Sequence, residues 1–149
     1  MARSYFSTVL DHDATAVWAV ARDFNGLATW WPAAVSESRI EEGKHADQVG
    51  AVRRFRLGEA TIRERLVALS DVDRSYRYEF CDPAPFPVVD YVATVRVTPV
   101  ADGGGRSFVE YEAVFDCHEA ERDHWTAFFT AEVFAPALEA LAGHLAGER

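Results

Sequence analysis

Cysteine, positive charge and long apolar runs are scarce in this sequence, and each scarcity excludes a class of protein. The two cysteines, Cys81 and Cys117, lie far apart and form no CxxC pair. A zinc knuckle or a thioredoxin-type redox site is therefore not supported, and we expect two reduced structural thiols. Histidines and glutamates gather at 118–124, but neither HExxH nor another ligand-spaced motif joins them, so we expect no metal site.

Basic side chains are outnumbered by acidic ones. Lysine and arginine total 15 against 24 aspartates and glutamates, which gives a formal net charge of −9. Nucleic acid and anionic membrane surfaces both attract basic faces, so we expect neither as a partner. No charged segment followed by an apolar run opens the chain, and no stretch approaches the roughly 20 apolar residues of a membrane-spanning helix. These absences predict a cytoplasmic protein.

Aromatic side chains, by contrast, are abundant. Ten Phe, five Tyr and four Trp make up 13% of the chain. That is more ring surface than a helical bundle of this length needs, and it is typical of a walled cavity. A chain of 149 residues has room for one core, so we expect a single domain over residues 1–149.

The hydrophobic periodicity predicts an α+β fold. Residues 3–10 form the first expected strand, 14–23 a helix capped by Asp13, and 27–31 a short aromatic turn. Strands are then expected at 34–41, 49–57, 60–70, 74–82, 88–100 and 106–116. From 119 to 146 the apolar spacing becomes helical, and Pro136 should kink this helix without ending it. Seven antiparallel strands need one face covered, and only this last helix is long enough to cover it.

The pair Gly58-Glu59 predicts how two of these strands align. Glycine in the first position fits a two-residue type II′ turn, which would place Leu57 opposite Ala60. Counting back along both strands puts Arg53 opposite Glu64, on the same face as several apolar side chains. An unpaired charge on that inward face would be very costly, so each ion needs the other or a polar ligand.

Four tyrosines are expected on the same inner wall. The register carried through the next turn and the alternation of the later strands select Tyr76, Tyr78, Tyr91 and Tyr111, with Phe55 and other apolar residues around them. Two interpretations remain open: the ion pair is a structural bridge and the tyrosines fill space, or both face a bound ligand. Trp31 is either plain core or part of the pocket mouth.

Six segments occur in a characteristic order along nearly the whole chain: VWAVARDFNGLATWWP (17–32), GAVRRFRL (50–57), IRERLVALSD (62–71), RSYRYEF (74–80), VVDYVATVRVTPV (88–100) and SFVEYEAVFD (107–116). The series resembles the polyketide cyclase/dehydrase branch of the START-like (SRPBCC) superfamily. The resemblance implies a helix-grip fold: a curved sheet of seven antiparallel strands around a long C-terminal helix, two short helices after strand 1, and a ligand between sheet and helix.

The same resemblance extends to plant abscisic-acid receptors and implies roles for single positions. Trp31 falls where those receptors have a ligand-anchoring lysine, so an anchor for a ligand carboxylate is missing here. Arg53 and Glu64 match a pocket arginine and glutamate. Tyr78 and Tyr91 match pocket aromatics of those receptors. The positions of their helix that line the cavity correspond to Phe129, Val133 and Ala137.

These observations leave functions of different classes open. The first is binding of a small, largely apolar or aromatic molecule with cofactor-independent cyclisation or dehydration of a polyketide-like substrate. Glu64 would be its base, Arg53 would stabilise negative charge, and Tyr78 would donate a hydrogen bond. The second is a non-catalytic carrier or sensor of a hydrophobic metabolite, and the third a homodimeric accessory protein. The predicted ligand-binding residues are Trp31, Phe55, Tyr76, Tyr91, Tyr111, Trp125, Phe129, Val133 and Ala137.

Overall fold

Most of the strands form consecutive antiparallel hairpins. The computed structural model describes residues 1–147, and within that range it has one sheet of seven strands. Six of the strands follow one another along the chain and pair in that order. They are β2 (Val35–Ile40), β3 (Val52–Leu57), β4 (Ala60–Ser70), β5 (Ser75–Phe80), β6 (Val89–Pro99) and β7 (Ser107–Asp116).

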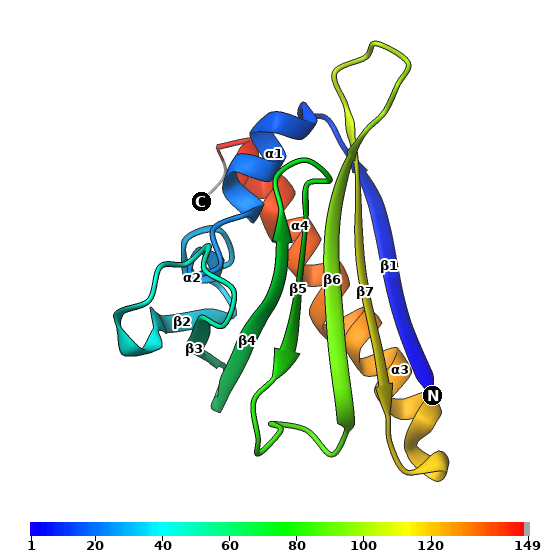
Figure 1. Cartoon of the computed structure of the whole chain (residues 1–149). Helices are drawn as coiled ribbons and strands as arrows, with labels where there is room; N and C mark the ends of the chain where they lie inside the picture. The colour runs from blue at the N-terminus through cyan, green and yellow to red at the C-terminus, as the bar shows by residue number, and fades with distance from the viewer. Residues whose placement is uncertain (148–149) are drawn as a thin grey trace.

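The first strand lies at the opposite edge of the sheet from the second. β1 (Ala2–Leu10) pairs with β7, so the sheet order is β1-β7-β6-β5-β4-β3-β2. The two short helices α1 (Ala14–Ala21) and α2 (Leu27–Trp30) carry the chain from one edge to the other, as Figure 1 shows. Asp13 caps α1 by accepting hydrogen bonds from the backbone N–H groups of Thr15 and Ala16, as its position predicted.

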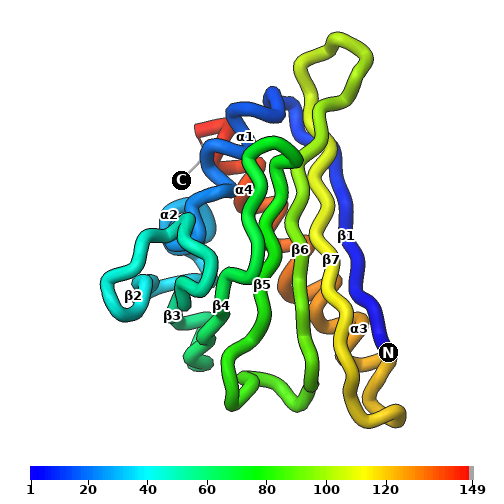
Figure 2. Tube along the Cα trace, viewed as in Figure 1, coloured from blue at the N-terminus to red at the C-terminus, as the bar shows by residue number. Residues whose placement is uncertain are grey.

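The C-terminal helical stretch crosses one face of the sheet. It comprises η2 (Glu119–Glu121), α3 (Arg122–Phe128), the π-helical segment η3 (Phe129–Phe134) and α4 (Ala135–Leu145). Figures 1 and 2 show it running along the face of the sheet turned away from the viewer. The expected helix-grip arrangement is therefore observed.

Pro136 does not end the helix, as expected. The six residues before α4 take the π-helical form, and Pro136 lies in the first turn of α4. Proline lacks an N–H and its ring crowds the carbonyl four residues earlier, so the regular hydrogen-bond ladder cannot continue through it. The wider π turn accommodates that loss while keeping the apolar stripe on the sheet, with Phe129, Phe134 and Leu138 fully buried.

The register predicted from the Gly58-Glu59 turn is confirmed. Leu57 pairs with Ala60, Phe55 with Ile62, and Arg53 with Glu64. Gly58 has a φ of +60° and Glu59 has no positive φ, as a type II′ turn requires. The strand predicted from residue 49 begins only at Val52, because Gly50 has a φ of +95° and interrupts the extended chain.

The inner face continues across the rest of the sheet as alternation predicted. Tyr76, Tyr78, Tyr91 and Tyr111 are all buried. The register between β4 and β5 shifts between Leu66 and Ala68, which the residues of the 71–73 turn do not predict. An extra residue on one strand is the mark of a β-bulge, and the tyrosines of β5 remain buried beyond it.

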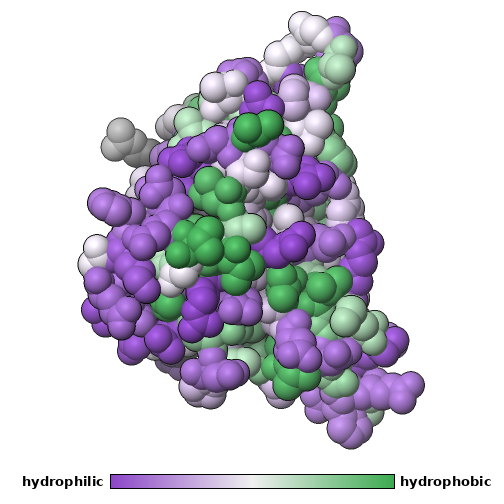
Figure 3. Space-filling model, in the orientation of Figure 1, coloured by the Kyte–Doolittle hydropathy of each residue, from purple (hydrophilic) through white to green (hydrophobic). Residues whose placement is uncertain are grey.

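Charged side chains cover the outer face of the sheet. Arg63 makes two hydrogen bonds of 2.7 Å to the Glu41 carboxylate, and Arg65 contacts Glu79 at 3.1 Å on the next strand. Figure 3 shows this face as mainly hydrophilic, with smaller apolar groups between the polar ones. The helices of residues 1–147 are all too short or too polar to cross a lipid bilayer.

Candidate functional site

The inner face of the β3–β4 hairpin holds a buried ion pair. Arg53 Nε donates to Glu64 Oε1 at 2.7 Å, and Arg53 Nη2 lies 2.7 Å from the same oxygen. Arg53 Nη1 donates to the backbone carbonyl of Phe24 at 3.3 Å. The Arg53 side chain is 1% exposed and that of Glu64 is 6% exposed. The two-residue turn thus places a cation and an anion opposite each other inside the core.

Aromatic rings enclose the guanidinium of Arg53. Its central carbon lies 4.1 Å from the centroid of the Phe24 ring and 4.7 Å from that of Tyr78. The rings of Phe55 and Tyr76 follow at 5.6 and 5.9 Å. Because ring faces carry partial negative charge, this enclosure stabilises a desolvated cation in addition to the ion pair.

Burial and pairing act in opposite directions on these ions. Burial raises the pKa of Glu64, because it disfavours the carboxylate, and the guanidinium of Arg53 opposes that shift. Burial alone would lower the pKa of Arg53, but the charge of Glu64 raises it above its usual value. Arg53 therefore stays charged, and its guanidinium favours the ionised form of Glu64 against the effect of burial.

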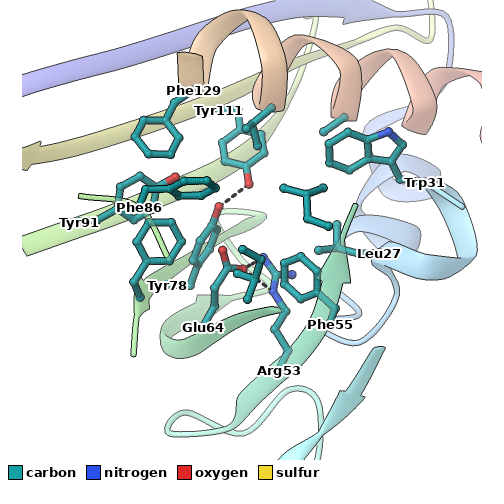
Figure 4. Close-up of a pocket in the computed structure, with 15 residues that line it drawn as sticks. Leu27, Trp31, Arg53, Phe55, Glu64, Tyr78, Phe86, Tyr91, Tyr111 and Phe129 are labelled. Atoms are coloured by element: carbon teal, nitrogen blue, oxygen red, sulfur yellow. Dashed lines mark hydrogen bonds and ion pairs between the residues drawn. The ribbon is translucent and has the colours of Figure 1, made fainter. Parts of the chain in front are cut away.

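Tyrosine hydroxyls continue the polar line from the ion pair towards the helix. The hydroxyls of Tyr78 and Tyr111 are hydrogen-bonded to each other, and Figure 4 shows this bond beside Glu64. Burial raises the pKa of Tyr78, Tyr91 and Tyr111 well above the usual value, so these hydroxyls stay protonated at neutral pH. The bond between the two hydroxyls uses only one of their two O–H groups as donor.

A cavity lies between these polar groups and the helix. It is lined by Leu27, Trp31, Arg53, Phe55, Leu57, Ile62, Glu64, Tyr78, Phe80, Phe86, Tyr91, Tyr111, Phe129, Val133 and Ala137. The volume open to a water-sized sphere is about 30 Å³, enough for about two water molecules. Sites for drug-sized ligands are on the order of ten times larger or more. The rings themselves fill most of the chamber in this conformation.

The mouth of the cavity can be located from the exposure of its lining. Most lining side chains are buried, whereas Leu57, Phe80, Phe86 and Val133 are only partly buried. The mouth therefore lies between the end of the β3–β4 hairpin, the loop between β5 and β6, and the π-helical segment η3. The ring of Phe86 fills much of this opening. Its centroid lies 5.1–6.0 Å from those of Phe80, Trp125, Phe128 and Phe129.

The structure brings most of the predicted site residues together around this cavity. The ten that line it are Trp31, Arg53, Phe55, Glu64, Tyr78, Tyr91, Tyr111, Phe129, Val133 and Ala137. Tyr76 and Trp125 do not line it. Tyr76 is buried behind the lining beside Phe24 and Trp18, and Trp125 lies outside the mouth with its indole N–H donating to Glu121. Their predicted contact with ligand would require a rearrangement of the lining.

Five lining residues were not among the predicted site residues. Three of them lie on strands: Leu57, Ile62 and Phe80. The other two lie outside the strands. Leu27 belongs to α2, and Phe86 to the proline-rich loop between β5 and β6. Alternation along strands cannot assign either of them to a face, because neither lies on a strand. The signal available for Phe86 was its isolation as a single aromatic residue among Pro83, Pro85 and Pro87.

The gathering of histidines and glutamates at 118–124 forms no metal centre. Within residues 1–147, no group of three or more His, Cys, Asp or Glu side chains is placed to hold a metal ion. His118 instead caps the short helix η2, because its Nδ1 accepts a hydrogen bond from the backbone N–H of Ala120 at 3.3 Å.

Comparisons with known proteins agree with this architecture. The family described as polyketide cyclase/dehydrase and lipid transport matches residues 1–147. No curated protein sequence matches the chain. The XoxI protein of Bacillus cereus is 28% identical with a TM-score of 0.84, over 98% of this chain and 96% of that one. A protein from Thermobifida fusca is 29% identical with a TM-score of 0.85, over 99% and 95%.

A plant enzyme shares the fold at lower identity. Norcoclaurine synthase from Thalictrum flavum, solved in complex with dopamine and hydroxybenzaldehyde, is 13% identical with a TM-score of 0.78. The match covers 99% of this chain and 87% of the enzyme. At this identity the likeness shows a shared fold alone.

Proposed function

The chain belongs to the polyketide cyclase/dehydrase and lipid transport family, and we propose that its cavity binds one small, largely apolar molecule. The observation that carries this proposal is the Arg53–Glu64 pair facing a chamber lined by rings. A buried ion pair stabilises a fold no better than well-packed apolar side chains of similar volume would. A pair kept next to a cavity, among three buried tyrosines, is better explained by contact with a ligand.

Ligand entry requires the rings at the mouth to move. The cavity of about 30 Å³ is too small for an aromatic molecule, so a bound ligand must displace part of the lining. Phe86 is the best candidate, because it is only partly buried and lies on a loop, whereas the tyrosines lie on paired strands. Movement of this loop would open the chamber without breaking the sheet.

A nuclear magnetic resonance titration with p-xylene as an apolar probe tests this proposal. The methyl groups of Leu27, Ile62 and Val133 line the cavity, whereas those of Val72 and Val89 are exposed on the surface. We expect saturable shifts at the lining methyls and unchanged signals at the two exposed valines. Shifts spread evenly over both sets, or none at all, would reject a ligand cavity.

Cyclisation or dehydration is a second candidate function, supported by the state of Glu64. Burial raises its pKa, and Oε2 receives no hydrogen bond from the rest of residues 1–147. With a polyketide-like substrate, Glu64 would take a proton from a carbon between two carbonyls. That carbon would attack a third carbonyl of the same chain, forming a C–C bond and an alkoxide that receives the proton back. Loss of water would complete the dehydration.

In this mechanism Glu64 and Tyr78 keep the roles expected from the sequence, and the role of Arg53 changes. Glu64 and Tyr78 line the cavity, and Tyr78 lies where it could donate to an enolate or alkoxide oxygen. Arg53 is 1% exposed, so it would act as a positioning residue that holds Glu64. If the wild type converts a substrate and Glu64→Gln binds it without converting it, the result would support catalysis. If the wild type binds enolisable polyketones but converts none of them, the result would support a carrier.

A further inference from the structure

The two ions of the buried pair do not face the cavity equally. The Arg53 side chain is 1% exposed, and its nitrogens contact Glu64 Oε1 and the Phe24 carbonyl. Its guanidinium is also flanked by the rings of Phe24 and Tyr78. The Glu64 side chain is 6% exposed, and its Oε2 accepts no hydrogen bond from residues 1–147. The Oε2 atom is not fully enclosed by protein, and because Glu64 lines the cavity we place this oxygen at the free space.

We propose that the cavity selects a neutral, largely apolar molecule whose polar end is a hydroxyl group, because Glu64 offers the cavity an unpartnered carboxylate oxygen, whereas every nitrogen of the Arg53 guanidinium already has a partner. This inference rests on the proposed ligand-binding function and narrows it to one class of ligand. It specifies two properties of the ligand: a hydrogen-bond donor at its polar end and no net charge.

The unpartnered oxygen requires a hydrogen-bond donor. A carboxylate only accepts hydrogen bonds, so Glu64 Oε2 is satisfied by an O–H or N–H of the ligand. A ligand carboxylate would instead meet a like charge in a water-poor chamber, with the only nearby cation among residues 1–147 already engaged. Anionic molecules are therefore rejected, although an arginine lies a few ångströms away.

Charge balance favours a neutral donor over a cationic one. Arg53 and Glu64 together carry no net charge, so an ammonium ligand would bring an uncompensated charge into the core. A hydroxyl has the further advantage that its oxygen can accept. The Tyr78–Tyr111 bond uses only one of the two O–H groups as donor, and Figure 4 shows Tyr78 between Tyr111 and Glu64. A phenol or alcohol can thus use both partners at once.

Four probes of nearly the same shape test the inference: p-cresol, p-xylene, p-toluate and 4-methylbenzylammonium. Their dissociation constants can be measured from the shifts of the Leu27 and Ile62 methyl groups. We expect p-cresol to bind tenfold or more tightly than p-xylene, since a hydrogen bond to a charged group contributes roughly that factor. We expect p-toluate and the ammonium to bind more weakly than p-xylene.

The outcomes separate this inference from the function on which it rests. If p-xylene binds but p-toluate or the ammonium binds as tightly as p-cresol, the selection for a neutral hydroxyl is wrong and the apolar cavity stands. Equal affinities of p-cresol and p-xylene would overturn it as well. If none of the four probes shifts the lining methyls, the proposed function and this inference both fail.

The variant Glu64→Gln provides a second test through charge complementation. Removal of the carboxylate leaves Arg53 as an unpaired buried cation, which a ligand carboxylate can neutralise. We expect p-toluate to raise the melting temperature of Glu64→Gln and to leave that of the wild type unchanged. Glu79→Gln, which removes the exposed charge that pairs with Arg65, is the matched control. Its melting temperature should not change with p-toluate. If Glu64→Gln does not fold, the wild-type probe series alone decides; stabilisation of the wild type by p-toluate would contradict the inference.

Discussion

Arg53 directs two of its nitrogens at a single oxygen of Glu64. Nε and Nη2 both lie 2.7 Å from Oε1, while Nη1 is bonded to the backbone of Phe24. The guanidinium thus fixes the carboxylate from one side and leaves its other oxygen to the cavity. The cation supports the anion, and in our proposal the anion is the group that contacts a ligand.

The strength of this support can be measured with Arg53→Met and the double variant Arg53→Met/Glu64→Met. The single change leaves a buried carboxylate without its partner, and we expect it to lower the free energy of unfolding by about 3–5 kcal/mol. The double change removes both charges, and we expect it to be less destabilising than the single one. Urea denaturation monitored by circular dichroism gives both values.

An exposed pair on the same sheet is the control for this series. Arg65 and Glu79 are 44% and 38% exposed, so Arg65→Met should change the free energy of unfolding by less than about 1 kcal/mol. If Arg53→Met were as mild as Arg65→Met, the buried pair would not be coupled as the geometry indicates.

The hydroxyl pair of Tyr78 and Tyr111 should behave as a unit. Either Tyr→Phe change leaves the other hydroxyl without its partner in the core. We expect a double-mutant cycle of Tyr78→Phe and Tyr111→Phe to give a coupling free energy of about 1 kcal/mol in thermal or urea unfolding. Additive effects of the two changes would show that the hydroxyls are independent.

Stability should depend on pH through Glu41 on the outer face. Two hydrogen bonds from Arg63 lower the pKa of Glu41 below its usual 4.5. The ionised carboxylate therefore adds stability above pH 4.5, and this contribution is lost as the pH falls through the lowered pKa. We expect the free energy of unfolding of the wild type to exceed that of Glu41→Gln by about 1 kcal/mol at pH 7, because the Glu41 side chain is partly exposed.

This difference should shrink when urea unfolding is repeated at pH values below 4.5. A difference that stays constant down to pH 3, or one that grows on acidification, would contradict the assigned direction of the pKa shift. Glu59→Gln, an exposed glutamate in the β3–β4 turn, serves as the control.

Removing the Phe86 ring should open the mouth of the cavity. We expect Phe86→Ala to increase the association rate of p-xylene several-fold, because the ring that covers the opening is gone. Line-shape analysis of the methyl resonances gives the rate. Phe6→Ala removes a partly buried ring that does not line the cavity and should leave the rate unchanged. A rate unaffected by Phe86→Ala would place the entrance elsewhere.

The sequence was most informative where the backbone permits one geometry. The turn at Gly58 restricts the register of β3 and β4 to one alignment, and from it the opposition of Arg53 and Glu64 could be predicted. Alternation then identified Tyr78, Tyr91 and Tyr111 as inward, because side chains on one strand can face only two ways.

Side chains outside the strands were harder to place. Phe86 lies on a loop without periodicity, and its position depends on contacts with the distant residues Trp125 and Phe129. Trp125 lies on the apolar stripe of the helix, but the stripe extends beyond the end of the chamber. The size of the cavity could not be predicted, because it depends on how closely all the rings pack.

Native mass spectrometry of freshly purified protein tests whether the cavity holds a ligand. We expect a subpopulation with the added mass of one small organic molecule, released on denaturation. It also predicts that Ala137→Phe, which fills the chamber from α4, abolishes this species while the protein stays folded. Retention of the same added mass by folded Ala137→Phe would show that the molecule is bound elsewhere and would contradict the assignment of the cavity as the binding site.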